Sequence, residues 1–561
     1  MEKGLNFRGI DGIIEMIGYG NLGHFGLEGI AYMKEFNTTA VCKPEKHYMV
    51  DISDRVKKIK ELVDAGKYFT INRARQYGKT TTLTALSDLL SNSYNVISIS
   101  FEGIDKDVFE NGATFSQAVA RLILDLHEFN NVPVPEMTIA ALEKLNEAEI
   151  QKVKMDELIR VFKRWIKSSD MPVVLIIDEV DSPADEQVFL DFLAQLRDSY
   201  ISRDAKGTPA FQSVILAGVT DVKHLKSKIR PDEDEKENSP WNIAADFDID
   251  MSLSEDGIKG MLDEYEADHH TGMDTANMAK LIWDQTSGYP FLVSRICQLI
   301  DERVCKTLSP SAAWTKEGFL KAVKMLLAEN NSLFQSITGK LNKYPKLRAA
   351  LRSILMEGTK LTYTAQTDSI SQMQMYGLIK NDNNTVAVAN RTFETMLYNL
   401  FLSEAELKNN VFYNSGELEK NRFIKDGKLD MPAIFLGFIK TYNQVVEKLV
   451  DRFKEEEGRE FFLLYLKPII NGTGNFYIES QTRDQLRTDV IVDYLGEQYI
   501  IELKVWRGPR YNEEGEKQVC EYLDRFDLQT GYMLSFNFNE KKEQGIKEYM
   551  INGKKLIEAT V

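Results

Sequence analysis

The sequence contains few cysteines, and they are scattered along the chain. The four cysteines stand at positions 42, 297, 305 and 520, with no CxxC spacing and no histidine at ligand distance along the chain. Zinc sites and disulfide frameworks depend on such spacings. The cysteine pattern therefore supports neither kind of site and fits a protein of the reducing cytoplasm.

Long hydrophobic runs are also missing. The longest, Val173–Ile177 and Phe461–Leu466, are far shorter than the roughly 18 residues that a membrane-spanning helix needs. The N-terminus has no basic region followed by an apolar stretch, which a secretion signal would need. We therefore expect no membrane partner and a cytoplasmic location.

An excess of positive charge is absent as well. The chain has 69 lysines and arginines against 85 aspartates and glutamates, a formal net charge of −16. Such a chain repels nucleic-acid phosphates at long range. Any nucleic-acid binding must therefore come from local basic patches or from bound metal ions.

What the chain does have is length and alternating strand and helix patterns. Its 561 residues predict three or four domains. Strands are predicted at 68–71, 96–99, 173–177 and 213–218, with helical segments between them. This alternation predicts an α/β domain with a parallel sheet covered by helices on both faces. The glycine-rich residues 1–33 are expected to be a flexible leader, or to reflect a start codon set too early, with Met33 as the true start.

A phosphate-binding loop is predicted between the first strand and the helix that follows it. Gly78, Lys79 and Thr80 form the second half of the G-x-x-x-x-G-K-[ST] motif, and Arg73 stands in place of its first glycine. Backbone N–H groups and the lysine would bind the phosphates, and the Thr80 hydroxyl would ligate magnesium. The expected nucleotide-binding residues of this loop are Arg75, Gln76, Tyr77, Gly78, Lys79, Thr80 and Thr81.

Two acids end a buried strand downstream of this loop. Asp178 and Glu179 follow the apolar run 173–177, and carboxylates at such a position are costly to bury unless they bind a cation. Asp178 is expected to hold the magnesium and Glu179 to orient the attacking water. Helix capping is the alternative role of this pair. Thr220 or Asp221, just past the strand predicted at 213–218, stands where a γ-phosphate sensor would lie, and capping of the next helix is the alternative role.

A second site is predicted near the C-terminus. The segments 489–492 and 499–504 read as a β-hairpin with its turn around Leu495. Glu502 and Lys504 are two residues apart and face the same side of their strand, and Asp489 stands on the neighbouring strand. Two carboxylates suit magnesium or manganese, and Lys504 would stabilise charge on a phosphate. The alternative is a cross-strand ion pair on a solvated face, but the apolar neighbours favour a buried central strand.

Between these sites the chain is mainly helical. Near 344–400 helices lead to a predicted strand at 376–379, a turn at 382–384 and a strand at 386–388, which resembles a winged helix. Its wing has no basic cluster, so a packing or regulatory role is favoured over DNA contact.

Two family resemblances follow from these residues. Segment 72–80 looks like the arginine-rich, degenerate Walker A of AAA-ATPase-like proteins of bacteria and archaea, and 287–292 resembles the Gly-x-Pro motif of related STAND-type ATPases. These resemblances imply ATP binding with conformational switching, and they place Pro290 near the nucleotide. Asp489 with Glu502-Leu503-Lys504 resembles the PD-(D/E)XK nuclease superfamily, and Gln518 starts a Gln-x-x-x-Tyr segment found in several of its branches.

The expected organisation is thus a P-loop domain at 34–270, a helical and winged-helix region at 271–402, linker helices at 403–440 and a restriction-endonuclease-like α/β domain at 441–561. The expected function is an ATP-gated, metal-dependent nuclease, with ATP and Mg²⁺ or Mn²⁺ as cofactors. Its expected partner is nucleic acid, with DNA favoured, and the resemblance suggests defence against foreign DNA. A homo-oligomer stays open. The alternatives are a nucleotide-switched protein that binds nucleic acid without cutting it, and a winged-helix DNA-binding regulator with a vestigial ATPase.

Overall fold

A computed structural model describes most of the chain. The described residues are 33–181, 183–184, 186–219, 240–356, 359–364, 366–408, 411–446, 455–470, 474–477, 490–495, 497–505, 516–517, 519–521, 523–524, 528–537 and 543–561. The expected leader at 1–32 lies outside these residues, as do four predicted site residues, Thr220, Asp221, Asp489 and Gln518.

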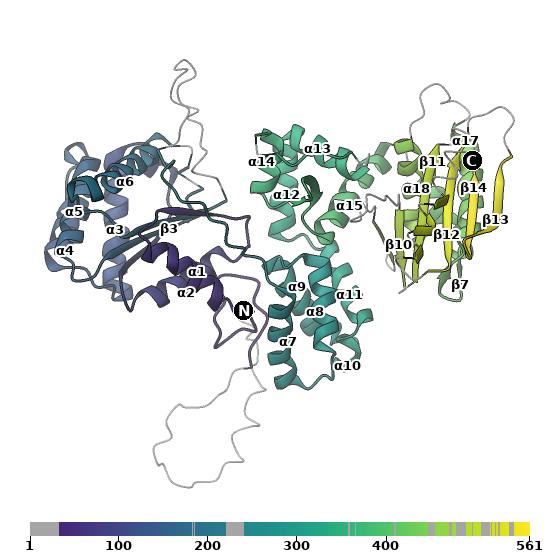
Figure 1. Ribbon diagram of the computed structural model, residues 1–561, viewed down its shortest axis with the longest axis horizontal. Coiled ribbons are helices and arrows are strands. Elements are labelled where there is room, and N and C mark those ends of the chain that lie inside the picture. The colour runs from purple at the N-terminus through teal and green to yellow at the C-terminus, as the bar shows by residue number, and fades with distance from the viewer. Residues whose placement is uncertain are drawn as a thin grey trace, which may run out of the picture.

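The first region is built on a four-stranded parallel sheet in the order β1-β4-β3-β2 (Figure 1). Its strands are β1 (Phe69–Asn72), β2 (Asn95–Ser100), β3 (Val173–Asp178) and β4 (Ser213–Gly218). Ala245 makes a parallel bridge to Phe69 on the free side of β1. The phosphate-loop strand β1 and the acid-bearing strand β3 are therefore separated by one strand, β4.

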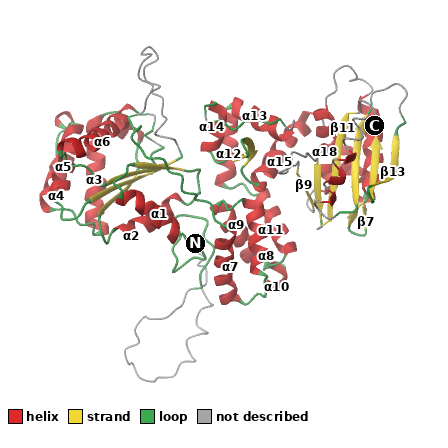
Figure 2. Ribbon diagram, viewed as in Figure 1, coloured by secondary structure: helices red, strands yellow, loops and turns green. Residues whose placement is uncertain are grey.

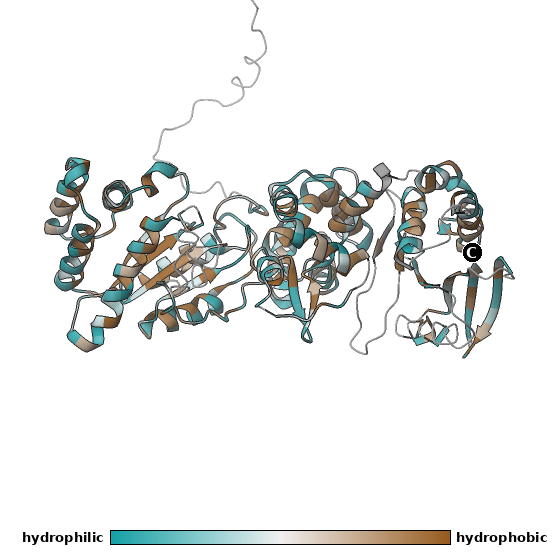
Figure 3. Cartoon of the chain, turned by 90° about the horizontal axis from the view of Figure 1, so that it is seen from above, coloured by the Kyte–Doolittle hydropathy of each residue, from teal (hydrophilic) through white to brown (hydrophobic). Residues whose placement is uncertain are grey.

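Helices cover both faces of this sheet, as the alternating pattern predicts. Every residue of β3 is buried, and successive residues enter two different cores. Val174 and Ile176 pack toward α1 and α2, whereas Leu175 and Ile177 pack toward α3, α5 and α6. In Figure 3 these strands are mostly brown, in keeping with burial on both faces. The helices are α1 (Ser53–Asp64), α2 (Lys79–Leu90), α3 (Gly112–Asn130), α4 (Glu136–Glu147), α5 (Met155–Ser168) and α6 (Gln187–Lys206).

A helical region follows and lies between the two sheets (Figure 2). It contains α7 (Glu255–His269), α8 (Thr275–Thr286), α9 (Pro290–Leu299), α10 (Pro310–Ala313), α11 (Lys316–Ala328), α12 (Ser332–Lys343), α13 (Pro345–Met356), α14 (Asp368–Met375) and α15 (Arg391–Lys408). A hairpin of β5 (Ile379–Asp382) and β6 (Thr385–Val388) stands between α14 and α15, and Thr362 bridges to Thr385.

The hairpin begins later than the sequence predicted. We expected a strand at 376–379, but Tyr376 caps α14 and the strand begins only at Ile379. Gly377 has a left-handed φ of 66°, which ends the helix and cannot continue a strand. The expected turn at 382–384 is present, with Asn383 and Asn384 both at positive φ.

The C-terminal region is a six-stranded mixed sheet in the order β13-β14-β12-β11-β10-β9. Its strands are β9 (Gly474–Tyr477), β10 (Val490–Tyr494), β11 (Glu497–Val505), β12 (Thr530–Phe536), β13 (Gly545–Ile551) and β14 (Lys554–Thr560). The predicted hairpin is confirmed: β10 pairs antiparallel with β11, and Leu495 in the turn has a φ of 50°. β11, β12 and β14 run parallel to one another, so β11 is a central strand.

The segment expected to link the regions packs on the second sheet. It contains α16 (Val411–Glu419), β7 (Ile424–Lys425), β8 (Lys428–Leu429) and the start of α17 (Met431–Val446). α17 contacts β13 and β14, and α16 contacts α18 (Glu455–Ile470). The Leu429 N–H donates to the Tyr499 hydroxyl at 2.9 Å. In the structure, these elements are therefore part of the C-terminal body.

Candidate functional site

The phosphate loop joins β1 to α2 through residues 73–78. Gln76 and Gly78 adopt left-handed φ values of 56° and 76°, and α2 begins directly afterwards at Lys79. The first N–H groups of a helix have no partner within the helix, and they carry the positive end of its dipole. The loop therefore presents the backbone donors that a phosphate needs.

The Lys79 ammonium group is buried in this loop. It donates to the carbonyl oxygens of Arg73 at 3.1 Å and Ala74 at 3.2 Å. Burial lowers the pKa of Lys79, and the nearby carboxylates, Glu179 foremost, raise it. The charge is thus held inside the loop by the loop's own carbonyls.

The two acids at the end of β3 differ in their surroundings. The Thr80 hydroxyl donates to Asp178 Oδ2 at 2.8 Å, and the Glu179 N–H donates to Asp178 Oδ1 at 2.9 Å. Thr80 and Asp178 thus provide adjacent oxygen atoms that could hold a magnesium ion. Burial raises the pKa of Glu179, although Lys79 opposes the shift. Glu179 also has a φ of 53°, an uncommon conformation for a residue that is not glycine.

Arg73, which replaces the first glycine of the motif, turns away from Lys79 toward another segment. Its guanidinium donates to the Ile249 carbonyl at 2.8 Å and lies 5.3 Å from the centre of the Phe247 ring. The segment around Phe247 follows Ala245, which bridges to β1. Arg73 therefore fixes the segment that flanks β1.

Other predicted loop residues contact the helical region or the N-terminal segment. The Tyr77 ring lies edge-on to the Tyr289 ring, with the ring centres 4.7 Å apart. The Tyr289 hydroxyl donates to the Arg75 carbonyl. The side chain of Arg75 is exposed. Gln76 Nε2 donates to the Ser332 hydroxyl at 3.2 Å. The Thr81 hydroxyl accepts from the Cys42 N–H at 3.2 Å, so this contact ties α2 to the N-terminal segment.

The residues before α9 bring Pro290 to the loop. Pro290 is the first residue of α9, and a Cβ built on Gly78 would lie 3.9 Å from Pro290 Cγ. Gly288 makes this approach possible, because its φ is 71° and a Cβ on it would lie 2.0 Å from the Leu253 carbonyl oxygen. The Leu253 N–H also donates to the Gly288 carbonyl at 2.8 Å.

The second candidate site lies on β11. Glu502 is 1% exposed, and its Oε1 lies 3.0 Å from the Lys504 Nζ. Both side chains point to the face of the sheet that the helical residues Val519, Cys520 and Leu523 help to cover, since Ile500 on the same face packs with them. The described part of β10 begins at Val490, which is paired with Ile501.

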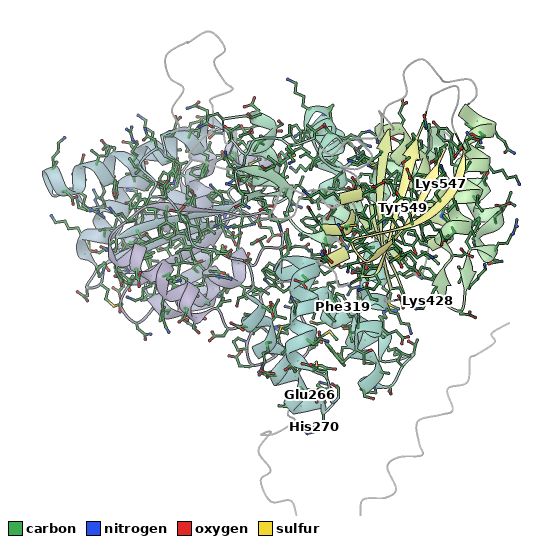
Figure 4. The ribbon with its side chains drawn as sticks, turned by 45° about the vertical axis from the view of Figure 1, so that its right-hand side comes forward. Glu266, His270, Phe319, Lys428, Lys547 and Tyr549 are labelled. Atoms are coloured by element: carbon green, nitrogen blue, oxygen red, sulfur yellow. The ribbon has the colours of Figure 1, made fainter. Side chains whose placement is uncertain are left out.

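Sequence reasoning missed a further buried acid on this face. Glu558 on β14 is 9% exposed and accepts hydrogen bonds from Ser535 at 2.8 Å and Tyr549 at 3.2 Å. Ser535 is the register partner of Lys504, so a polar row crosses three strands. Figure 4 shows Tyr549 and Lys547 on β13, next to β14. A single acid within the apolar run 556–559 was the signal that could have revealed Glu558.

Glu460 on α18 has a structural contact of its own. It accepts from Arg352 on α13 at 2.9 Å, and the neighbouring Arg459 donates to the Met356 carbonyl at 3.0 Å. These bonds join the helical region to the C-terminal body.

A metal-binding cluster and a membrane-spanning helix are both absent from the residues that the structure describes. Within them, no group of three or more histidine, cysteine, aspartate or glutamate side chains is arranged to hold a metal, and Asp489 lies outside these ranges. No helix in the part of the chain that the structure describes is long and apolar enough to cross a membrane.

The fold and these sites define a P-loop ATPase-like protein with a C-terminal nuclease-type domain. Residues 41–404 match the AAA-like domain family, and residues 475–549 match the PD-(D/E)XK nuclease superfamily. The first match spans more than half of the chain, which therefore belongs to the AAA-like domain family.

Solved structures that resemble the chain are distant in sequence. The Walker-type ATPase of Pyrococcus abyssi is 13% identical, with 65% of this chain and 99% of that chain covered and a TM-score of 0.45. Cdc6p from Pyrobaculum aerophilum is 15% identical, with 66% and 97% covered and a TM-score of 0.32. A search of curated proteins finds no match to this sequence.

Proposed function

We propose that this protein is a metal-dependent nuclease that cuts phosphodiester bonds in nucleic acid under the control of ATP. The observation that carries the proposal is the placement of buried Glu502 beside Lys504, whose side chain is 14% exposed, on one face of a central strand within the region that matches the nuclease superfamily. A buried carboxylate with a largely buried ammonium beside it is costly to place there, which favours a chemical role.

In this proposal, Glu502 and Asp489 hold a magnesium or manganese ion. Asp489 directly precedes Val490, whose register partner Ile501 directly precedes Glu502. The ion would supply an activated water and neutralise charge on the phosphate. Lys504, which contacts Glu502, would stabilise the negative charge that develops on the phosphate, and Gln518 would orient substrate.

ATP is proposed to bind at the phosphate loop. Lys79 would exchange its bonds to the loop carbonyls for phosphate oxygens, and Thr80 with Asp178 would hold the magnesium. Glu179 would orient the attacking water, and Thr220 would sense the γ-phosphate. Pro290 lies against Gly78 and would follow any movement of the loop.

The proposed control of the nuclease by ATP rests on contacts at both ends of the helical region. Gln76 bonds to Ser332, and a Cβ on Gly377 would lie 2.8 Å from Ala74 Cβ, so α12 and the turn after α14 touch the phosphate loop. At the far end, Arg352 pairs with Glu460. A change in the loop can thus reach the C-terminal body through α12, α13 and α18.

The test is cleavage of labelled DNA and RNA with magnesium or manganese, with and without ATP. Glu502→Gln should abolish cleavage while ATP binding persists, and Lys79→Met should abolish ATP binding and with it the effect of ATP on cleavage. Glu521→Gln, which removes one acid from the helix over the same sheet face, is the matched control. Cleavage by the Glu502→Gln variant at the wild-type rate would reject this active site.

The second candidate function is a nucleotide-switched protein that binds nucleic acid without cutting it. It is favoured by the ion pair itself, since Lys504 already neutralises Glu502 in the structure. Binding without cleavage under every metal condition would support it. The biological target that the family resemblance suggests for either function is foreign DNA.

A further inference from the structure

One stretch of this acidic chain contains basic residues and no acidic ones. Residues 332–356, which form α12 and α13, contain five lysines and arginines and no aspartate or glutamate, in a chain with a net charge of −16. The five are Lys340, Lys343, Lys346, Arg348 and Arg352. By contrast, residues 451–561 contain 16 basic and 21 acidic residues, so the nuclease-type region offers a phosphate chain no net attraction.

The two arginines and the three lysines of this stretch have different environments. Arg348 pairs with Glu404, and Arg352 pairs with Glu460. No carboxylate of the described residues forms an ion pair with the three lysines, and Lys343 and Lys346 are exposed. Their charge is therefore available to a partner outside the chain.

Two tyrosines hold two of these lysines in place. Lys340 lies 4.7 Å from the centre of the Tyr376 ring, and Lys343 lies 5.4 Å from that of Tyr344. The two rings are stacked with their centres 6.2 Å apart. A hydrogen bond with Tyr376 and the nearby Lys343 lower the pKa of the Tyr344 phenol. Cation–π contacts of this kind restrict long side chains that would otherwise be mobile.

We propose that Lys340, Lys343 and Lys346, together with Tyr344 and Tyr376, bind the phosphate backbone of a nucleic acid. We call these five residues the lysine–tyrosine patch. Two of these ammonium groups are held by tyrosine rings, and none of the three forms an ion pair with a carboxylate of the described residues, so they suit a polyanion. Contacts to phosphate alone carry no sequence preference. The inference rests on the proposed function in taking nucleic acid as the partner, but it does not depend on cleavage.

The elements that carry the lysine–tyrosine patch also contact the phosphate loop. Ser332 begins α12 and bonds to Gln76, and Lys340 and Lys343 lie near the other end of the same helix. Tyr376 directly precedes Gly377, which lies against Ala74. A change in the phosphate loop would thus affect how a nucleic acid binds at the patch. Figure 1 places α12, α13 and α14 between the two sheets.

The experiment measures binding of the full chain to labelled duplex DNA, single-stranded DNA and RNA over a series of salt concentrations, with EDTA present to prevent cleavage. The test variant is Lys340→Gln/Lys343→Gln. The matched control is Lys144→Gln/Lys167→Gln, which removes two exposed lysines from α4 and α5, on the far side of the first sheet. Thermal unfolding of each variant checks that it is folded.

Loss of two phosphate contacts should reduce the slope of log K against log salt by about 1.8 for duplex DNA and about 1.4 for single strands, and the control should keep the wild-type slope. The probe for which the slope changes most identifies the nucleic acid that the patch binds. An unchanged slope in the test variant, an equal change in the control, or no binding of any nucleic acid would overturn the proposal. Binding in EDTA and cleavage in magnesium are measured separately, so failure of the nuclease site and failure of the patch give different results.

Discussion

The Arg352 guanidinium and the Glu460 carboxylate lie 2.9 Å apart and connect α13 of the AAA-like region to α18 of the C-terminal body. Both side chains are partly exposed, so we expect the pair to contribute no more than about 1 kcal/mol to stability. Its importance would lie in communication between the two regions.

This pair can be tested by exchanging its charges. Arg352→Glu should weaken the dependence of cleavage on ATP with little change in the melting temperature, since the pair is partly solvated. The double variant Arg352→Glu/Glu460→Arg should restore that dependence. If both variants respond to ATP as the wild type does, the route from loop to nuclease does not pass through this ion pair.

Lys79 and Thr80 should have separable effects on nucleotide binding. Lys79→Met should abolish ATP binding, because its buried ammonium lies inside the loop and interacts with the acids at the end of β3, Glu179 foremost. Thr80→Ala should mainly remove the dependence on magnesium. Thr84→Ala, one turn further along α2, is the control, and equal losses in the Thr80 and Thr84 variants would contradict the assignment. Calorimetric titration with ATP, with and without magnesium, measures all three.

Removing Lys504 should cost stability as well as activity. Lys504→Met leaves the carboxylate of Glu502 buried without its ion-pair partner, and we expect a loss of about 3–5 kcal/mol. Glu502→Gln/Lys504→Met should recover part of that loss, because neither member of the pair then carries a charge. Denaturant unfolding followed on the C-terminal region compares the variants, and an equal loss in the single and double variants would show that the charge is not the cause.

Gly288 should tolerate no side chain. Gly288→Ala would combine a positive φ with a Cβ 2.0 Å from the Leu253 carbonyl oxygen, so we expect a loss of at least about 1–2 kcal/mol and weaker ATP binding. Gly260→Ala is the matched control, because it lies within α7 with no atom within 4 Å of the new Cβ, and it should stabilise slightly. Thermal unfolding with and without ATP compares the two, and similar melting temperatures would contradict this view of the turn.

Asp493 should make the stability of the C-terminal sheet depend on pH. Burial raises its pKa, and a hydrogen bond from Gln498 at 2.8 Å favours the carboxylate. A carboxyl whose pKa is higher in the folded chain than in the unfolded chain favours folding when protonated, and that contribution is lost as pH rises through the folded pKa. Gln498→Leu should therefore destabilise the fold by about 1–2 kcal/mol near neutral pH and by less near pH 4. A loss that is independent of pH would exclude Asp493 as the cause.

The sequence predicted the elements that local pattern determines. The run 173–177 identified β3 because it is apolar on both faces, and the turn at Leu495 followed from the strand-like segments on either side of it. The phosphate loop and the paired acids were recognisable from spacing between a strand and a helix. Those features depend on residues that are close in the chain.

What could not be predicted depends on residues that are far apart. The pairing of Arg352 with Glu460 joins residues 108 positions apart, and the close contact of Gly288 with Leu253 depends on how the helices pack. Arg73 was recognised only as a missing glycine, since its bond to Ile249 requires the segment beside β1 to be in place. Local pattern carries no information on such contacts.

The outer strand β13 also bears on how copies of this chain could associate. An edge strand offers unpaired backbone groups to which a strand of another molecule could add. Lys547 and Glu548 alternate along β13 and are each engaged in an ion pair, with Glu543 and Lys555. A strand added at this edge would place its own side chains beside these charged ones, which disfavours extension of the sheet between molecules. We therefore expect any regulated assembly to use another surface.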